Sequence, residues 1–143
     1  MFKKIFSKKK ENNDSSNNIL IAALLIHAAK IDDNYTEPER EIIKRALISL
    51  DLTTTNEVEE LLKKADQKEG ESNQIIEFTR EVKKNSMEFR LKIVEMLWKI
   101  IYSDGTSDNY ESNLIRRVCG LLYISNKDNG LIKLKMQNLK NKV

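Results

Sequence analysis

The stretch ILIAALLIHAAKID, residues 19–32, is apolar over its first eleven positions except for His27. A run of this length is too short to span a bilayer, which takes about twenty residues. The polar residues that precede it include Glu11 and Asp14, which argues against a signal peptide. Apolar side chains on nearly every face are typical of a buried helix. The stretch therefore predicts a central helix of a folded domain, in a protein that we expect to be cytoplasmic.

A second stretch, LKIVEMLWKIIYSD at residues 91–104, superposes on the first when the chain is shifted by 72 positions. Apolar residues coincide at most positions of the two stretches. The same shift pairs polar residues: Asp32 with Asp104, Glu39 with Glu111, Lys44 with Arg116, and Arg45 with Arg117. We therefore expect an internal repeat, in which two helix, acidic turn, helix units pack about a pseudo-twofold axis. Helices 18–31 and 86–103 should be its most buried pair.

The remaining sequence predicts further helices with short connections. The periodicity and capping residues predict seven helices. Six lie at about 18–31, 37–50, 56–69, 86–102, 108–123 and 126–139, and the fourth in chain order carries Ile75, Ile76, Thr79 and Val82. Thr36 and Ser72 are expected to cap the second and fourth helices, Asn85 or Ser86 to begin the fifth, and Gly70 to end the third. No segment alternates like a half-buried strand, and one Pro with four Gly argues against many tight turns. The fold class is therefore an all-α bundle of about seven helices.

Charge divides the chain of 143 residues into two parts. Residues 1–10 hold five lysines and no acid, whereas the remainder has a net charge of −2 within an overall +3. We expect residues 1–17 to form a flexible basic leader and residues 18–143 to form one helical domain. The slightly acidic domain predicts no binding to nucleic acid. One cysteine and one histidine exclude an internal disulfide and the usual zinc sites.

The acidic turns are the candidate functional site. In DGTSDNYE, residues 104–111, an Asp precedes Gly and a Glu follows six positions after that Gly, as in the second half of an EF-hand loop. Ile100 and Tyr102 occupy the places of two further ligands, so a complete EF-hand is excluded. A partial oxygen site for a divalent metal ion remains. Its candidate ligands are Asp32, Asp33, Glu39, Asp104, Asp108 and Glu111.

Helix capping offers an alternative explanation for the same acids. Thr36-x-x-Glu39 and Asp108-x-x-Glu111 both have the spacing of a capping box, in which the two side chains bond each other's backbone N–H groups. Asp32 and Asp104 are explained less directly, although an acid near a helix N-terminus is favourable. Capping alone and capping combined with metal binding both stay open.

The stretches AAKIDDNYTEPERE (28–41) and IYSDGTSDNYES (101–112) resemble the TerB family, named for tellurite resistance. The N-terminal domain of a membrane-anchored DnaJ-like co-chaperone is related to that family. The resemblance covers about residues 18–125, and the first stretch lacks the Gly of the second. It implies an all-α bundle with an acidic, metal-binding surface and no catalytic activity. It also implies protein partners in metal or chemical stress responses, at or near the inner membrane. The alternative is a purely structural interaction domain, or a membrane-tethered co-chaperone-like one, that binds no metal.

The N-terminal tail predicts contact with anionic membranes. Phe2, Ile5 and Phe6 share one face of a helical turn, and Lys3 and Lys4 lie beside them. Apolar and basic groups in this arrangement are typical of a peripheral lipid anchor. A disordered solubilising tail is the alternative.

Three single residues have plainer interpretations. We expect His27 to be a helix residue without a metal, Cys119 to be a buried inert thiol, and Trp98 to pack in the core.

Overall fold

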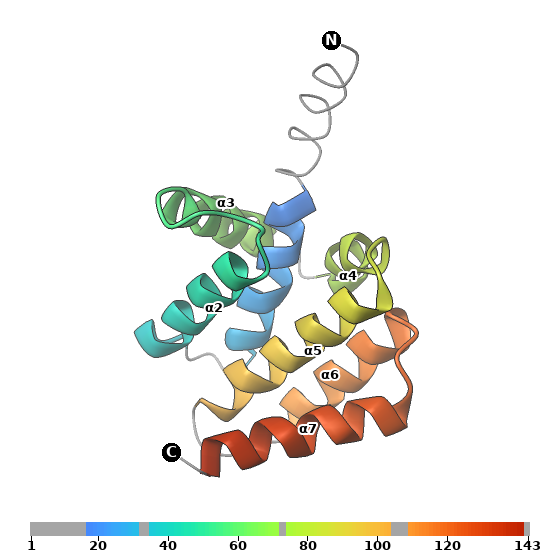
Figure 1. The fold of residues 1–143 in the computed structure, drawn as a ribbon. Helices are drawn as coiled ribbons and strands as arrows, with labels where there is room; N and C mark the ends of the chain where they lie inside the picture. Colours follow the sequence, from blue (N-terminus) through green and yellow to red (C-terminus); the bar gives the residue numbers. More distant parts are fainter. Residues whose placement is uncertain (1–16, 32–34, 72–73, 104–108, 142–143) are drawn as a thin grey trace.

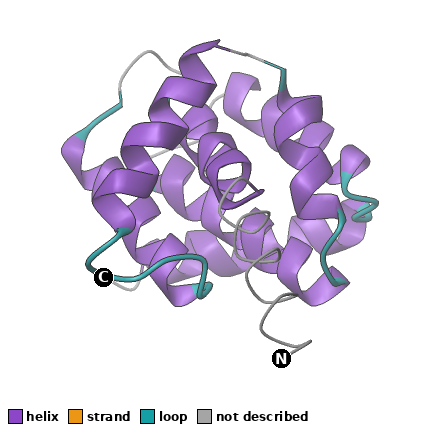
Figure 2. Cartoon of the chain, turned by 90° about the horizontal axis from the view of Figure 1, so that it is seen from above, coloured by secondary structure: helices purple, strands orange, loops and turns teal. Residues whose placement is uncertain are grey.

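The computed structural model describes residues 17–31, 35–71, 74–103 and 109–141, with the side chains of 109–111 and 140–141 left out. These residues form a helical bundle, and no strand occurs among them (Figures 1 and 2). The first helix covers residues 17–29 and is drawn in blue in Figure 1. The others follow in chain order: α2 (Glu37–Ser49), α3 (Val58–Glu71), α4 (Ile75–Lys83), α5 (Met87–Tyr102), α6 (Asn109–Leu121) and α7 (Asn126–Asn141). The expected all-α fold is confirmed.

The first helix and α5 form the centre of the bundle. Residues 21–26 of the first helix are all buried, as are Ala28 and Ala29. In α5 the buried side chains run from Ile93 to Tyr102, and α5 packs against α2, α4, α6 and α7. Burial on nearly every face is what their apolar sequences predict. The surrounding helices each contribute one apolar stripe, as their mixed sequences require.

Two helix starts agree with the sequence and one does not. Thr36 caps α2 and Ser86 caps α5, each accepting a hydrogen bond from a backbone N–H three residues on. Helix α4, in contrast, begins at Ile75 with Gln74 in the N-cap position, and Gln74 makes no side-chain cap bond. The expected cap Ser72 lies outside the described residues and is not the N-cap residue.

The end of α3 also differs from the expectation. The helix continues through Gly70 to Glu71. A glycine inside a helix costs about 1 kcal/mol relative to alanine. The neighbouring Glu69 is buried and bonds to His27 and Lys30 of the first helix, which holds this last turn in helical form. Tertiary contacts therefore override the local stop signal.

Helices α2 and α6 end in the same way. Asp51 and Tyr123 follow them with positive φ angles of 62° and 58°, and they are 72 positions apart. After α2, Asp51 N donates to Ile48 O and Leu52 N to Leu47 O. After α6, the equivalent bonds join Tyr123 to Gly120 and Ile124 to Cys119. Both ends are Schellman motifs. The local geometry thus repeats at the spacing of the sequence repeat, while the pseudo-twofold axis itself stays a prediction.

Candidate functional site

Most of the predicted metal ligands lie outside the described residues. This is true of Asp32, Asp33, Asp104 and Asp108, and of the tail residues Phe2, Lys3, Lys4, Ile5 and Phe6. Glu111 belongs to α6, but its side chain is not described. Glu39 is the predicted ligand whose environment is described.

Glu39 is the third residue of α2, and only 2% of it is exposed. Its Oε1 accepts hydrogen bonds from Thr36 N at 2.9 Å and from Thr36 Oγ1 at 3.0 Å. In return Glu39 N donates to Thr36 Oγ1 at 3.3 Å. The capping box expected at this turn is therefore formed. It fixes a buried carboxylate six positions after Asp33 in the sequence.

Ion pairs surround the start of α2 on its outer side. Arg40 Nη2 lies 2.6 Å from Glu59 Oε2, and Lys44 Nζ lies 2.8 Å from Glu59 Oε1. Hydrogen bonds from these two cations lower the pKa of Glu59 to about 2. Glu59, in the first turn of α3, is thus a surface anion paired with two cations. Its carboxylate is already occupied by protein cations.

A second group of charges lies where the first helix meets α3. Lys30 Nζ is 2.8 Å from Asp66 Oδ1 and 3.1 Å from Glu69 Oε2. His27 Nδ1 approaches Glu69 Oε1 at 3.3 Å. The acids raise the pKa of Lys30, although its partial desolvation by burial opposes them. His27 is thus a half-buried residue that contacts the carboxylate of Glu69, and Glu69 is also paired with Lys30.

A cavity of about 380 Å³ opens between these two groups of charges, beside α2 and α3. Tyr35, Arg40, Glu59 and Asp66 are among the residues that line it. Burial raises the pKa of Tyr35 to about 12, so its hydroxyl stays protonated at neutral pH. The acids of this cavity are paired with cations, which leaves little free negative charge to attract a metal ion.

Soft-metal and thiol chemistry finds no support among the described side chains. No group of three or more His, Cys, Asp or Glu residues is placed there to hold a metal ion. Cys119 is buried, and burial raises the pKa of its thiol to about 12. A buried, protonated thiol is a poor nucleophile and a poor ligand. The expectation of a buried cysteine is confirmed.

A second cavity, of about 410 Å³, lies between α5, α6 and α7. It was not anticipated from the sequence. Its walls include Trp98 of α5, Ser112 and Arg116 of α6, and Asn126, Asn129 and Lys133 of α7. Gly130 of α7 also lines it. These lining residues come together only because three helices cross at this point, and no local sequence pattern encodes that crossing.

Within the described part of the chain, every helix is too short or too polar to cross a bilayer. The described residues define an all-helical module with the carboxylate of Glu39 buried at the start of α2. The chain belongs to the TerB family, since the family model described as "Tellurite resistance protein TerB" matches residues 18–134. No curated protein and no solved structure matches the chain.

Proposed function

We propose that this chain is a non-enzymatic binding module that holds a divalent metal ion in its acidic turns and contacts partner proteins in a metal or chemical stress response. Membership of the TerB family supports the proposal. The observation that carries it is the buried Glu39, a carboxylate fixed by Thr36 at the start of α2 and six positions after Asp33 in the sequence. A charged carboxylate is costly to bury unless it is paired or coordinates a metal. Thr36 supplies hydrogen bonds to this carboxylate, and a bound cation would interact favourably with its charge.

The donor chemistry indicates a hard cation. The six proposed ligands, Asp32, Asp33, Glu39, Asp104, Asp108 and Glu111, are all carboxylates. Oxygen ligands suit Ca²⁺ and Mg²⁺, whereas zinc sites in proteins usually include thiolate or imidazole. When bound, the ion would draw the two acidic turns together and present a surface that partner proteins could distinguish from the metal-free one. With few carboxylates per turn, we expect a Kd on the order of 10⁻⁴–10⁻³ M.

The arrangement of the helices is consistent with one shared site. In Figure 1 the first helix and α5, which lead into the two acidic turns of the sequence, run toward the same side of the bundle. Helices α2 and α5 pack against each other. A shared site would gather more carboxylates than either turn alone, and affinity would rise accordingly.

Calorimetric titration of the full chain with Ca²⁺, Mg²⁺ and Zn²⁺ tests this proposal. The double variant Asp104→Asn, Glu111→Gln removes two charges from the second turn but keeps side chains that can still cap α6. We expect it to weaken Ca²⁺ binding by about tenfold or more, because affinity follows the number of ligand charges.

The matched control is Glu88→Gln, Asp128→Asn, which removes the same charge from exposed positions at the starts of α5 and α7. It should bind Ca²⁺ as the unmodified chain does. Equal heats in all three proteins would leave the alternative, in which the acids only cap helices and the module is a structural interaction domain.

A further inference from the structure

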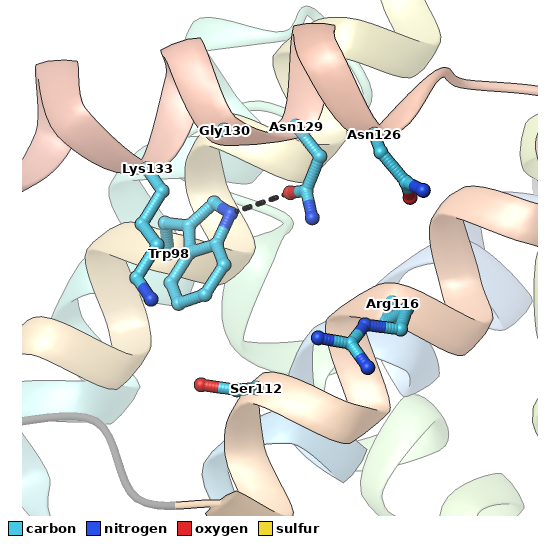
Figure 3. Close-up of a pocket in the computed structure, with 7 residues that line it drawn as sticks. All are labelled: Trp98, Ser112, Arg116, Asn126, Asn129, Gly130 and Lys133. Atoms are coloured by element: carbon cyan, nitrogen blue, oxygen red, sulfur yellow. Dashed lines mark hydrogen bonds between the residues drawn. The ribbon is translucent and has the colours of Figure 1, made fainter.

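The cavity between α5, α6 and α7 carries an inference that does not depend on the proposed metal site. Figure 3 shows the side chains that line it. The guanidinium of Arg116 extends from α6 into the space, and Asn129 and Lys133 reach down from α7 on either side of Trp98. A volume of about 410 Å³ lies within the range of small-molecule sites, about 300–1,000 Å³.

The bond between Trp98 and Asn129 fixes the polarity of one wall. Trp98 Nε1 donates to Asn129 Oδ1 at 2.9 Å. An indole nitrogen can only donate, so the amide must turn its oxygen to Trp98 and offer its NH₂ group elsewhere. Figure 3 shows this nitrogen directed into the cavity. Because Trp98 is almost fully buried, the core holds this donor in place.

Two cations add charge to the same space. Lys133 Nζ lies 5.3 Å from the centre of the Trp98 ring, a distance at which a cation and an aromatic face attract each other. No carboxylate lines the cavity in the described part of the chain, and no described acid forms an ion pair with Arg116 or Lys133. The lining groups therefore offer positive charge and hydrogen-bond donors to an anion.

In the first half of the chain, the equivalent cation is paired with a carboxylate of the protein itself. Lys44 is 72 positions before Arg116, and it pairs with the carboxylate of Glu59, which also binds Arg40. Ser112 stands 72 positions after Arg40, and α7 supplies asparagines and a lysine along its cavity wall where α3 supplies acids. Among the described residues, the second cavity thus keeps a cation but has no carboxylate in its lining.

We propose that this cavity binds a small molecule through a phosphate monoester group. A phosphate dianion matches two cations and presents three oxygens to Arg116, Lys133 and the Asn129 amide. Arginine in particular pairs with phosphate through two parallel hydrogen bonds. The rest of the cavity is much larger than a phosphate and would hold the organic part of the ligand. Gly130 leaves this part open, because a Cβ there would meet nothing within 4 Å.

The test uses the full chain at low ionic strength with EDTA, so that the metal site plays no part. The chain has one tryptophan, and its indole N–H gives one resolvable NMR signal beside the cavity. We expect ribose 5-phosphate to shift this signal saturably, inorganic phosphate to do so more weakly, and ribose to have no effect. Added salt should weaken the binding, because it screens the charges.

Two variants and one control locate the site. Arg116→Gln, Lys133→Gln should weaken ribose 5-phosphate binding by about tenfold or more. Gly130→Leu should abolish it by filling the cavity while raising helix propensity, so the fold is kept. The control Arg117→Gln, Lys127→Gln removes the same charge from exposed residues that do not line the cavity. Equal loss in the control, unchanged binding to Gly130→Leu, absence of a saturable shift, or equally strong binding of succinate would each overturn the proposal.

Discussion

Glu39 shows how one side chain can serve two purposes. Its Oε1 closes the capping box with Thr36, and its carboxylate is buried at the start of α2, where we propose that it is also a metal ligand. The capping box could be recognised in the sequence, because it depends only on a threonine and a glutamate three residues apart. The near-complete burial of Glu39 could not, because that depends on the helices packed over it. Substitutions at this residue can separate the two roles.

We predict that Glu39→Ala lowers the free energy of unfolding by about 1–2 kcal/mol, because the reciprocal bonds with Thr36 are lost. Glu39→Gln should cost less than about 1 kcal/mol, since glutamine also forms the capping box. Urea unfolding followed by circular dichroism measures both. Equal losses for the two variants would mean that the charge, and not the cap, stabilises α2.

Glu59 predicts a pH dependence of stability. Its pKa is lowered to about 2 from an ordinary value of 4.5 by hydrogen bonds from Arg40 and Lys44. A lowered pKa in the folded state means that its contribution is complete above about pH 4.5 and is lost as the pH falls toward 2. The exposed position makes the effect modest. As the pH is lowered from 6 to 2, the melting temperature should therefore fall less steeply for Glu59→Gln than for Glu60→Gln. Identical slopes would show that the ion pairs at Glu59 add nothing.

Among the elements, the sequence predicted helix type and the locally capped starts better than helix ends. Thr36 and Ser86 mark their helices because capping acts within one turn. The prediction that α3 ends at Gly70 was wrong, because the contacts of Glu69 with the first helix stabilise the last turn by more than the glycine destabilises it. The second cavity was missed because Trp98 and Asn129 lie on different helices. Their bond depends on a crossing angle that neither helix specifies.

The two Schellman motifs give a prediction about helix ends. Asp51 has a positive φ of 62°, a conformation that favours glycine. Asp51→Gly should raise the free energy of unfolding by about 0.5–1 kcal/mol. Tyr123→Gly should gain less, because Tyr123 also contacts Lys83, with an Nζ to hydroxyl distance of 3.1 Å. Chemical unfolding of both variants measures the difference, and a destabilised Asp51→Gly would contradict this account of the α2 end.

For the whole molecule, the division of charge is the feature that could be predicted most directly from the sequence. Five lysines lie in residues 1–10, and the remainder carries a net −2. Net charge requires no knowledge of the fold. The distribution of that charge does, because the structure pairs Lys30, Arg40 and Lys44 with acids while Arg116 and Lys133 face a cavity.

The charge division predicts where an anionic membrane would bind. Deleting residues 1–10 should abolish co-sedimentation with anionic vesicles at low salt, because the acidic remainder is repelled. Phe2→Ala with Phe6→Ala should weaken it, because apolar insertion and charge are both needed. The full chain should also lose binding at about 1 M salt, where screening acts within about 3 Å. If the shortened chain pellets as well as the full one, the tail is only a solubilising leader.

The most direct measurement of the central claim is a calorimetric Ca²⁺ titration of Glu39→Gln beside the unmodified chain. This variant keeps the capping box and removes one negative charge from the buried position. We predict that the free energy of unfolding of Glu39→Gln lies within about 1 kcal/mol of that of the unmodified chain. We also predict that its Ca²⁺ binding is weakened by about tenfold or more. Ca²⁺ binding of undiminished affinity in Glu39→Gln would contradict the claim that this carboxylate belongs to a metal site.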